Sequence, residues 1–143
     1  MAYTTSRRLG FGDCDPSGIA YFPAYLHTLV GVFEEFFGEI GFPWPHMIQE
    51  RKFGFPTVTL DLAFKSPCRH GEMMDFLLKV IRVGNSSLDL QHVVTTGNRL
   101  LWTASQRLVL TSHETHKPVP WPDDMRSALN KHLEKDDAHH PAA

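Results

Sequence analysis

The chain has 143 residues, 42% of them hydrophobic and 21% charged, which is typical of one folded domain and too apolar for a disordered chain. Its 14 basic and 16 acidic residues give a net charge of −2, which excludes the basic excess that proteins use to bind nucleic acid. Two cysteines are too few for a disulfide framework, the histidines lack metal-ligand spacing, and no apolar run reaches membrane-helix length, so we expect no metal site and no membrane partner.

The first third of the chain predicts a strand, a loop and a long helix. Residues 3–10 have the length of a strand, and residues 10–18 are rich in glycine, proline and short polar residues, which is typical of an ordered loop. Pro23 suits the first turn of a helix, and apolar residues then recur at steps of three and four up to Ile40. This apolar face consists of Tyr25, Leu26, Leu29, Val30, Phe33, Phe36, Phe37 and Ile40. Residues 42–51 predict a turn and then a short helical turn.

After residue 56 the hydrophobic period changes to two, which is typical of strands. Four strands are predicted, over residues 57–64, 73–83, 88–94 and 100–110. Residues 123–133 predict a short helix, and residues 136–143 predict a disordered tail. We see no domain boundary, so residues 1–135 are expected to form a single domain.

This element order predicts an α+β domain in which one helix covers one face of an antiparallel sheet. Apolar residues such as Leu77 and Ile81 lie opposite Phe76 and Val80 on the same predicted strand, so both sheet faces carry apolar side chains. A second copy of the chain is expected to cover the remainder, which predicts a dimer or a larger assembly.

Asp15 is the candidate for chemistry, because it lies in the Gly/Pro-rich loop directly before the predicted helix. A carboxylate beside apolar residues can act as a nucleophile or general base, and the unpaired N–H groups of a helix start can stabilise an oxyanion. This combination suits acyl transfer. An aspartate in such a loop is more often a turn former or a helix cap, so the pattern alone does not specify a catalytic role.

Two adjacent segments resemble the signature loop of the 4-hydroxybenzoyl-CoA thioesterase family: Phe11-Gly12-Asp13-Cys14-Asp15-Pro16-Ser17-Gly18-Ile19 and Tyr21-Phe22-Pro23-Ala24-Tyr25. The similarity is dense over residues 11–45 and continues more weakly to about Leu110. It implies the α+β hotdog fold, in which an antiparallel sheet of five or six strands wraps around one long central helix.

The same resemblance implies hydrolysis of an acyl-CoA to a free acid and CoA. CoA is then part of the substrate, and no separate cofactor is expected. It also implies a homodimer that assembles into a homotetramer. The first eight residues show no signal-peptide pattern, so a cytoplasmic location is expected.

Carried over by position, the resemblance makes Asp15 the catalytic carboxylate and the backbone N–H of Phe22 the donor that polarises the thioester carbonyl. Pro23 has no N–H, which agrees with a donor at Phe22. Asp13 would share a face with Asp15 in an extended segment, and we interpret it as a loop-shaping hydrogen-bond acceptor. Cys14 has no histidine in a local motif, and we interpret it as structural.

Two departures from the family concern the acyl group. Pro16 stands where a histidine usually follows the catalytic aspartate in the branch that acts on short aliphatic acyl-CoAs, which favours the aryl-CoA branch. Val30 stands where the hydroxybenzoyl enzyme has a carboxylate that recognises the ring hydroxyl. We therefore predict a benzoyl-type acyl group without a para hydroxyl, although plain core packing of Val30 is equally open. A thioesterase of broad or short-chain aliphatic range and a non-catalytic acyl-CoA-binding module are the alternatives.

Other substrate contacts are predicted less directly. The residues that could line the acyl pocket, or simply fill the core, are Tyr25, Val30, Trp44, Phe55 and Phe64. The candidates for contacts with CoA are Arg82 and Ser87, followed by Lys65, Arg69 and His70, because the basic cluster of the nearest family loop is missing at residues 84–87. A second thioesterase branch uses a helical glutamate, for which Glu34 and Glu35 are the weaker candidates.

Overall fold

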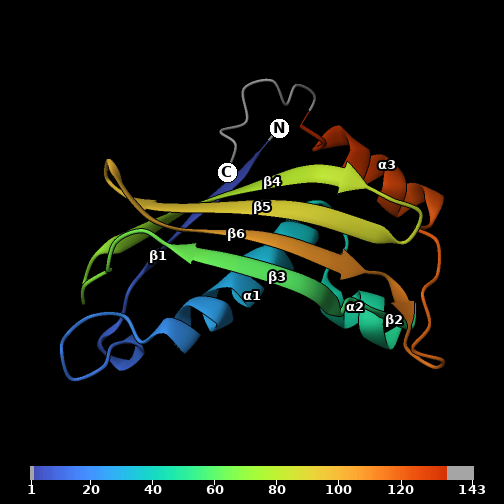
Figure 1. The fold of residues 1–143 in the computed structure, drawn as a ribbon. Coiled ribbons are helices and arrows are strands. Elements are labelled where there is room, and N and C mark those ends of the chain that lie inside the picture. The colour runs from blue at the N-terminus through green and yellow to red at the C-terminus, as the bar shows by residue number, and fades with distance from the viewer. Residues whose placement is uncertain (1, 135–143) are drawn as a thin grey trace.

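Five strands form one antiparallel sheet in the order β1-β4-β5-β6-β3 in a computed structural model that describes residues 2–134 (Figure 1). The strands are β1 (Tyr3–Arg8), β3 (Thr57–Phe64), β4 (Met73–Val83), β5 (Ser87–Thr96) and β6 (Arg99–Val109). All five strands were predicted, β1 from the length of its segment and the others from the change of hydrophobic period after residue 56, and the α+β class is confirmed. The predicted tail, residues 136–143, lies outside the described residues.

The long helix α1 (Phe22–Glu39) lies along one face of the sheet (Figure 1). Its buried residues are Tyr25, Leu29, Val32, Phe33, Phe36 and Phe37. Val30, which the spacing predicts on the apolar face, is 44% exposed, whereas Val32 is fully buried. Each residue turns the helix by 100°, so a broad apolar face includes positions at its margin that the sheet does not cover.

Alternate residues of the three central strands face α1 and form the core with it. They are Met74, Phe76, Leu78 and Val80 of β4, Leu88, Leu90 and Val94 of β5, and Trp102, Ala104 and Leu108 of β6. Leu77 and Ile81 lie on the opposite face of the sheet and are only half-buried in the single chain. The sheet therefore keeps partly apolar surface on its outer side.

Smaller elements close one end of the sheet. They are the helices α2 (Trp44–Gln49) and α3 (Asp123–Lys131) and the two-residue strands β2 (Phe53–Gly54) and β7 (Thr111–Ser112), which pair with each other. Arg51 Nη1 contacts Asp124 Oδ2 at 2.8 Å and so joins the end of α2 to α3. The two short strands were not predicted, because two residues carry no measurable period. In the described part of the chain, no helix combines the length and the hydropathy that a bilayer crossing requires.

One polar pair lies inside this apolar core. His92 is 1% exposed, and its Nε2 lies 2.8 Å from Gln106 Oε1. Gln106 uses its own amide N–H to donate to Thr57 Oγ1 at 3.0 Å, so its oxygen is the acceptor and His92 Nε2 carries the proton. Burial lowers the pKa of His92 from 6.5 to about 4, so this side chain is neutral at physiological pH.

Candidate active site

The loop between β1 and α1 forms a tight turn around Asp15. The N–H of Gly18 donates to the Asp15 carbonyl at 2.9 Å, and the N–H of Asp15 donates to the Ile19 carbonyl at 3.0 Å. Gly18 has a φ of +82°, which a residue with a Cβ adopts only at a cost. Cys14 pairs with Ala20 across the turn, so the local sequence closes the loop on itself.

The side chain of Asp15 is exposed in the single chain and binds its own loop. Its Oδ1 accepts the N–H of Ser17 at 2.8 Å and also the Ser17 hydroxyl. These two bonds, with the hydroxyl contributing most, lower the pKa of Asp15, so the carboxylate is ionised at neutral pH. Asp13 differs: its Oδ2 accepts the N–H of Gly10 at 3.1 Å, which is the loop-shaping contact expected of it.

The start of α1 presents one backbone donor next to this loop. Tyr21 donates its N–H to the Asp13 carbonyl at 2.8 Å, which joins the helix entry to the Asp15 loop. Phe22 is the first residue of the helix, so its N–H has no acceptor within the helix, and Pro23 has no N–H. The Phe22 amide, predicted from the sequence as the carbonyl donor, is therefore available at the positive end of the helix dipole.

A cavity of about 330 Å³ opens beside Phe22. Its lining consists of Ile19, Ala20, Phe22, Tyr25, Phe64, Lys65, Ser66 and Pro67. Tyr25 stacks between Phe64, at 5.8 Å between ring centroids, and Trp102, at 5.1 Å. Phe22 meets Phe64 edge-on at 6.2 Å. Because the wall is mostly aromatic and apolar, the cavity suits a flat apolar group rather than a charged one.

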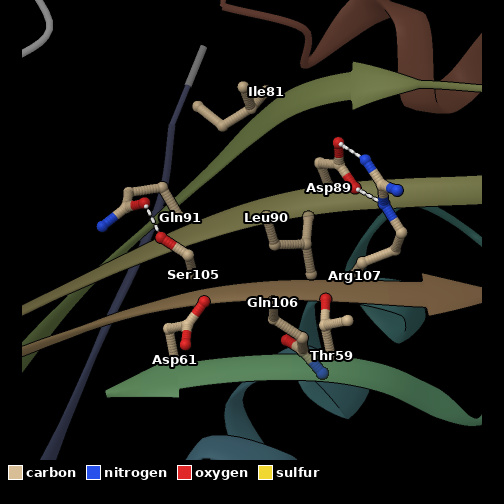
Figure 2. A pocket seen from close by; sticks show the side chains of 9 residues that line it. All are labelled: Thr59, Asp61, Ile81, Asp89, Leu90, Gln91, Ser105, Gln106 and Arg107. Atoms are coloured by element: carbon tan, nitrogen blue, oxygen red, sulfur yellow. Dashed lines mark hydrogen bonds and ion pairs between the residues drawn. The ribbon is translucent and has the colours of Figure 1, made fainter.

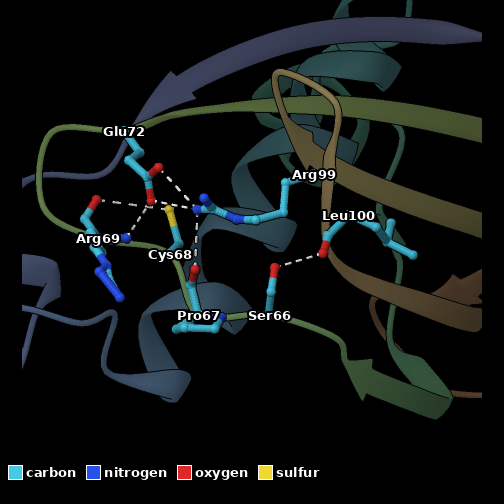
Figure 3. A network of polar contacts seen from close by, with 7 residues as sticks. All are labelled: Ser66, Pro67, Cys68, Arg69, Glu72, Arg99 and Leu100. Carbon is cyan, nitrogen blue, oxygen red and sulfur yellow. Dashed lines mark hydrogen bonds and ion pairs between the residues drawn. The ribbon is translucent and has the colours of Figure 1, made fainter.

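The segment before β4 forms one rim of this cavity and is braced by a polar network (Figure 3). The Glu72 carboxylate accepts the N–H of Arg69 at 2.7 Å and the Arg99 guanidinium at 2.7 and 2.9 Å. The same Arg99 nitrogen reaches the Pro67 carbonyl at 3.3 Å. The network ties the segment to the start of β6.

That braced segment in turn holds the Asp15 loop in place. Ala20 donates its N–H to the Cys68 carbonyl at 2.8 Å, and His70 donates its N–H to the Gly18 carbonyl at 3.1 Å. Residues some 50 positions apart in the chain thus form one rigid surface, which the sequence pattern did not reveal. Only Phe64, Lys65, Arg69 and His70 had been singled out from this region.

Two of the predicted pocket residues lie elsewhere. Trp44 and Phe55 stack on each other at 5.5 Å with an interplanar angle of 8°, and Phe55 packs against Phe37 at 5.0 Å. Phe37 lies about 22 Å along α1 from Phe22, at 1.5 Å per residue. Within one chain, Trp44 and Phe55 therefore fill the core at the far end of the helix from Asp15.

The predicted CoA contacts are divided between the two ends of the sheet. Lys65 lines the cavity, and Arg69 and His70 lie on the segment that supports the Asp15 loop. Arg82 lies near the other end of β4, about 30 Å along the strand from Met73, and Ser87 begins β5 at that same end. Arg82 is exposed, and the Ser87 carbonyl accepts Trp121 Nε1 at 2.9 Å.

Glu35, one of the alternative carboxylates, is engaged elsewhere. It accepts the Tyr3 hydroxyl and, at 2.8 Å, Arg7 Nη2, and so joins α1 to β1. The hydrogen bond from Tyr3 is the largest cause of the lowered pKa of Glu35. This carboxylate joins two elements at a distance from the cavity lining.

A second groove, of about 270 Å³, lies on the outer face of the sheet (Figure 2). Its side chains bind one another: Arg107 contacts Asp89 at 2.7 and 2.9 Å, and Ser105 donates to Gln91 at 2.8 Å. The strands separate this groove from α1, whose ribbon lies behind the sheet (Figure 2). Within residues 2–134 no three His, Cys, Asp or Glu side chains are grouped to hold a metal ion.

Comparison with known proteins adds to this geometry. A family model described as the thioesterase-like superfamily matches residues 9–129. The 4-hydroxybenzoyl-CoA thioesterase of Pseudomonas sp. (strain CBS-3) is 33% identical over 73 residues, which are 50% of this chain and 52% of that protein. The matched region thus spans about half the length of this curated relative.

Two solved structures match over nearly their whole length. A gentisyl-coenzyme A thioesterase superposes with a TM-score of 0.81 at 25% identity, covering 89% of this chain and 99% of that one. A 1,4-dihydroxy-2-naphthoyl-CoA thioesterase from Synechocystis superposes with a TM-score of 0.83 at 20% identity, covering 99% and 100%. These likenesses confirm the expected hotdog fold, with a sheet of five strands.

Proposed function

The chain belongs to the thioesterase-like superfamily, and we propose that it hydrolyses an aromatic acyl-CoA to the free acid and CoA. The observation that supports this proposal is that the loop carrying an ionised Asp15 is hydrogen-bonded to the start of α1, whose first residue, Phe22, lines an aromatic cavity. Each part has a place in thioester hydrolysis, and the loop between them is internally hydrogen-bonded.

In the proposed reaction the Phe22 N–H donates to the thioester carbonyl oxygen, where negative charge develops. Asp15 either attacks the carbonyl carbon, giving a mixed anhydride that water cleaves, or removes a proton from the attacking water. The C–S bond breaks, the CoA thiolate leaves and takes up a proton, and one water supplies the new oxygen of the acid. The low pKa of Asp15 suits either role, because both need the ionised form.

Aromatic acyl groups are favoured by the cavity and by the names of the relatives. Tyr25 and Phe64 offer ring faces and edges beside Phe22. The three relatives described above are named for 4-hydroxybenzoyl, gentisyl and 1,4-dihydroxy-2-naphthoyl thioesters. Val30 cannot accept a hydrogen bond from a ring hydroxyl, and its side chain is exposed enough to meet a ligand or a second subunit.

We predict that benzoyl-CoA is hydrolysed with a higher kcat/KM than 4-hydroxybenzoyl-CoA and than short aliphatic acyl-CoAs. Val30→Asp should shift the ratio of the two kcat/KM values towards 4-hydroxybenzoyl-CoA by about tenfold, because a side chain that accepts a hydrogen bond from the ring hydroxyl favours the hydroxylated substrate. Val30→Leu, which changes size without adding an acceptor, is the control. Thiol release from the panel measures this, and a clear wild-type preference for 4-hydroxybenzoyl-CoA would contradict the assignment of Val30.

We further propose that two copies of the chain build the working site. If Arg82 and Asp15 contact the same acyl-CoA, a second protomer has to supply one of them, because the length of β4 separates them within one chain. The exposed apolar side chains of Phe22, Val58 and Phe64 near the β3 edge supply surface for such an assembly.

This arrangement predicts complementation between two damaged variants. Asp15→Asn and Arg82→Ala should each be impaired alone, whereas mixed refolded samples should recover about a quarter of the wild-type activity at low substrate, because half of the dimers then hold one intact site. Light scattering gives the mass of the assembly. A monomeric mass, or a mixture no more active than the sum of its parts, would contradict the shared site.

A further inference from the structure

Ser17 makes the only side-chain contacts to the Asp15 carboxylate within residues 2–134. Its hydroxyl and its backbone N–H both donate to Oδ1, the latter at 2.8 Å. The backbone N–H of Ile19 also favours the ionised carboxylate, but it contributes less than either Ser17 donor. Both Ser17 donors therefore lie on one carboxylate oxygen, Oδ1.

The backbone around Ser17 leaves this arrangement little freedom. Pro16 has a fixed φ, and the Gly18 N–H donates to the Asp15 carbonyl at 2.9 Å, so the three residues after Asp15 form a closed turn. An aspartate that accepts the N–H two residues later is a recurrent turn of this kind. The serine hydroxyl adds a second donor to that turn, which glycine or alanine could not supply.

We propose that Ser17 is a positioning residue for the Asp15 carboxylate: it holds Oδ1 through two hydrogen bonds, so that Oδ2 is the oxygen presented to the thioester or to the attacking water. This inference rests on the proposed function of Asp15 and deepens it. A carboxylate that is already held in its reactive orientation loses less conformational freedom when it reacts.

The other titratable side chains near Asp15 do not take the place of Ser17. Asp13 and Cys14 lie on the same loop, and Asp13 is occupied by the N–H of Gly10. Arg69 and His70 lie on the segment that packs against the loop, where their backbone groups pair with Ile19 and Gly18. No ion pair joins Asp15 to either of these side chains in the described structure, so the Ser17 hydroxyl is the side-chain donor that favours the ionised carboxylate.

The test compares Ser17→Ala and Ser17→Thr. Ser17→Ala should lower kcat by about three- to tenfold with little change in KM, because the backbone donor remains and only the hydroxyl is lost. The acid limb of the kcat profile should move to higher pH, because a carboxylate that loses a donor binds its proton more tightly. Ser17→Thr keeps the hydroxyl and should restore both quantities.

Ser6→Ala is the matched control. The Ser6 hydroxyl also donates to an exposed aspartate, Asp75 Oδ1, at 2.7 Å, but on β1 and β4. This variant should keep the wild-type kcat and pH profile. If Ser6→Ala and Ser17→Ala have the same kcat and pH profile, the Ser17 hydroxyl is an ordinary surface contact and the proposal is overturned.

A carboxyl ¹³C titration separates this proposal from the function on which it rests. The resonance of Asp15 should titrate at a higher pH in Ser17→Ala than in the wild type, whether or not Asp15 takes part in catalysis. An unchanged titration overturns the role of Ser17, even if Asp15→Asn is inactive. A shifted titration together with an active Asp15→Asn would instead overturn the proposed function and leave the contact intact.

Discussion

Asp15→Asn is expected to lower the kcat for thioester hydrolysis by about 10²- to 10⁴-fold while CoA binding persists. An asparagine has the same shape, and its oxygen can still accept the two donors of Ser17, so the loop keeps its turn. It lacks the negative charge that either a nucleophile or a base requires. Thiol release measures hydrolysis, and calorimetry with free CoA measures binding.

Asp75→Asn is the control for this substitution. Asp75 is also exposed and also accepts a serine hydroxyl, but it lies on β4, and its loss should leave kcat near the wild-type value. If Asp15→Asn hydrolyses benzoyl-CoA at a near-normal rate, Asp15 is a turn residue and the proposed function is wrong. Hydrolysis in ¹⁸O water over repeated turnovers distinguishes the two catalytic roles, because only direct attack by the side chain leaves label in Asp15.

Mild acid is expected to destabilise the fold through His92. The unfolded chain titrates this group near pH 6.5 and the folded chain at about 4, so between these values only the unfolded state binds the proton. The free energy of unfolding should therefore fall as the pH drops from 6.5 to 4, by about 3 kcal/mol in total. Urea unfolding at a series of pH values measures this slope.

The double variant His92→Leu/Gln106→Leu tests the cause of that slope. It removes both partners of the buried pair together, so neither is left unsatisfied, and stability near pH 7 should change little. The slope between pH 6.5 and 4 should largely disappear. His113→Gln, which removes an exposed histidine, should keep it. An unchanged slope in the double variant would contradict the buried neutral histidine.

Carboxylates do not account for the loss of stability in the upper part of this window, above about pH 5. Glu35, Glu72 and Asp124 all have a lowered pKa, the first through the Tyr3 hydroxyl, the second through the Arg69 N–H and the third through Arg51. Groups of this kind stabilise the fold above their unfolded pKa, and the contribution is lost at lower pH as they take up protons. Their effect follows that of His92 as the pH falls.

The acid sensitivity could not be predicted from the sequence. His92 lies on the inward-facing side of β5, but the alternating pattern does not show whether a histidine there is fully buried or reaches solvent. Its partner Gln106 lies 14 residues away on β6, and the pair forms only when β5 and β6 align in their observed register. Strand register depends on contacts along both strands and on the turn between them.

Local signals predicted the Asp15 loop and the start of α1 more fully. The turn around Asp15, the missing N–H of Pro23 and the free amide of Phe22 all follow from residues within ten positions of one another. The Ser17 contact was readable from the same stretch, since an aspartate followed two residues later by serine favours this turn, but it was not predicted.

By itself, the sequence determined the long helix, the strands and the loop that carries Asp15 ahead of the helix, because these depend on residue spacing and backbone preferences over short distances. Only the tertiary structure decided that the network of Glu72 and Arg99 braces the Asp15 loop, that Trp44 and Phe55 fill the far end of the core, and that the cavity lies beside Phe22. Such contacts join segments far apart in the chain, and they exist only after packing has fixed the sheet order and the strand register.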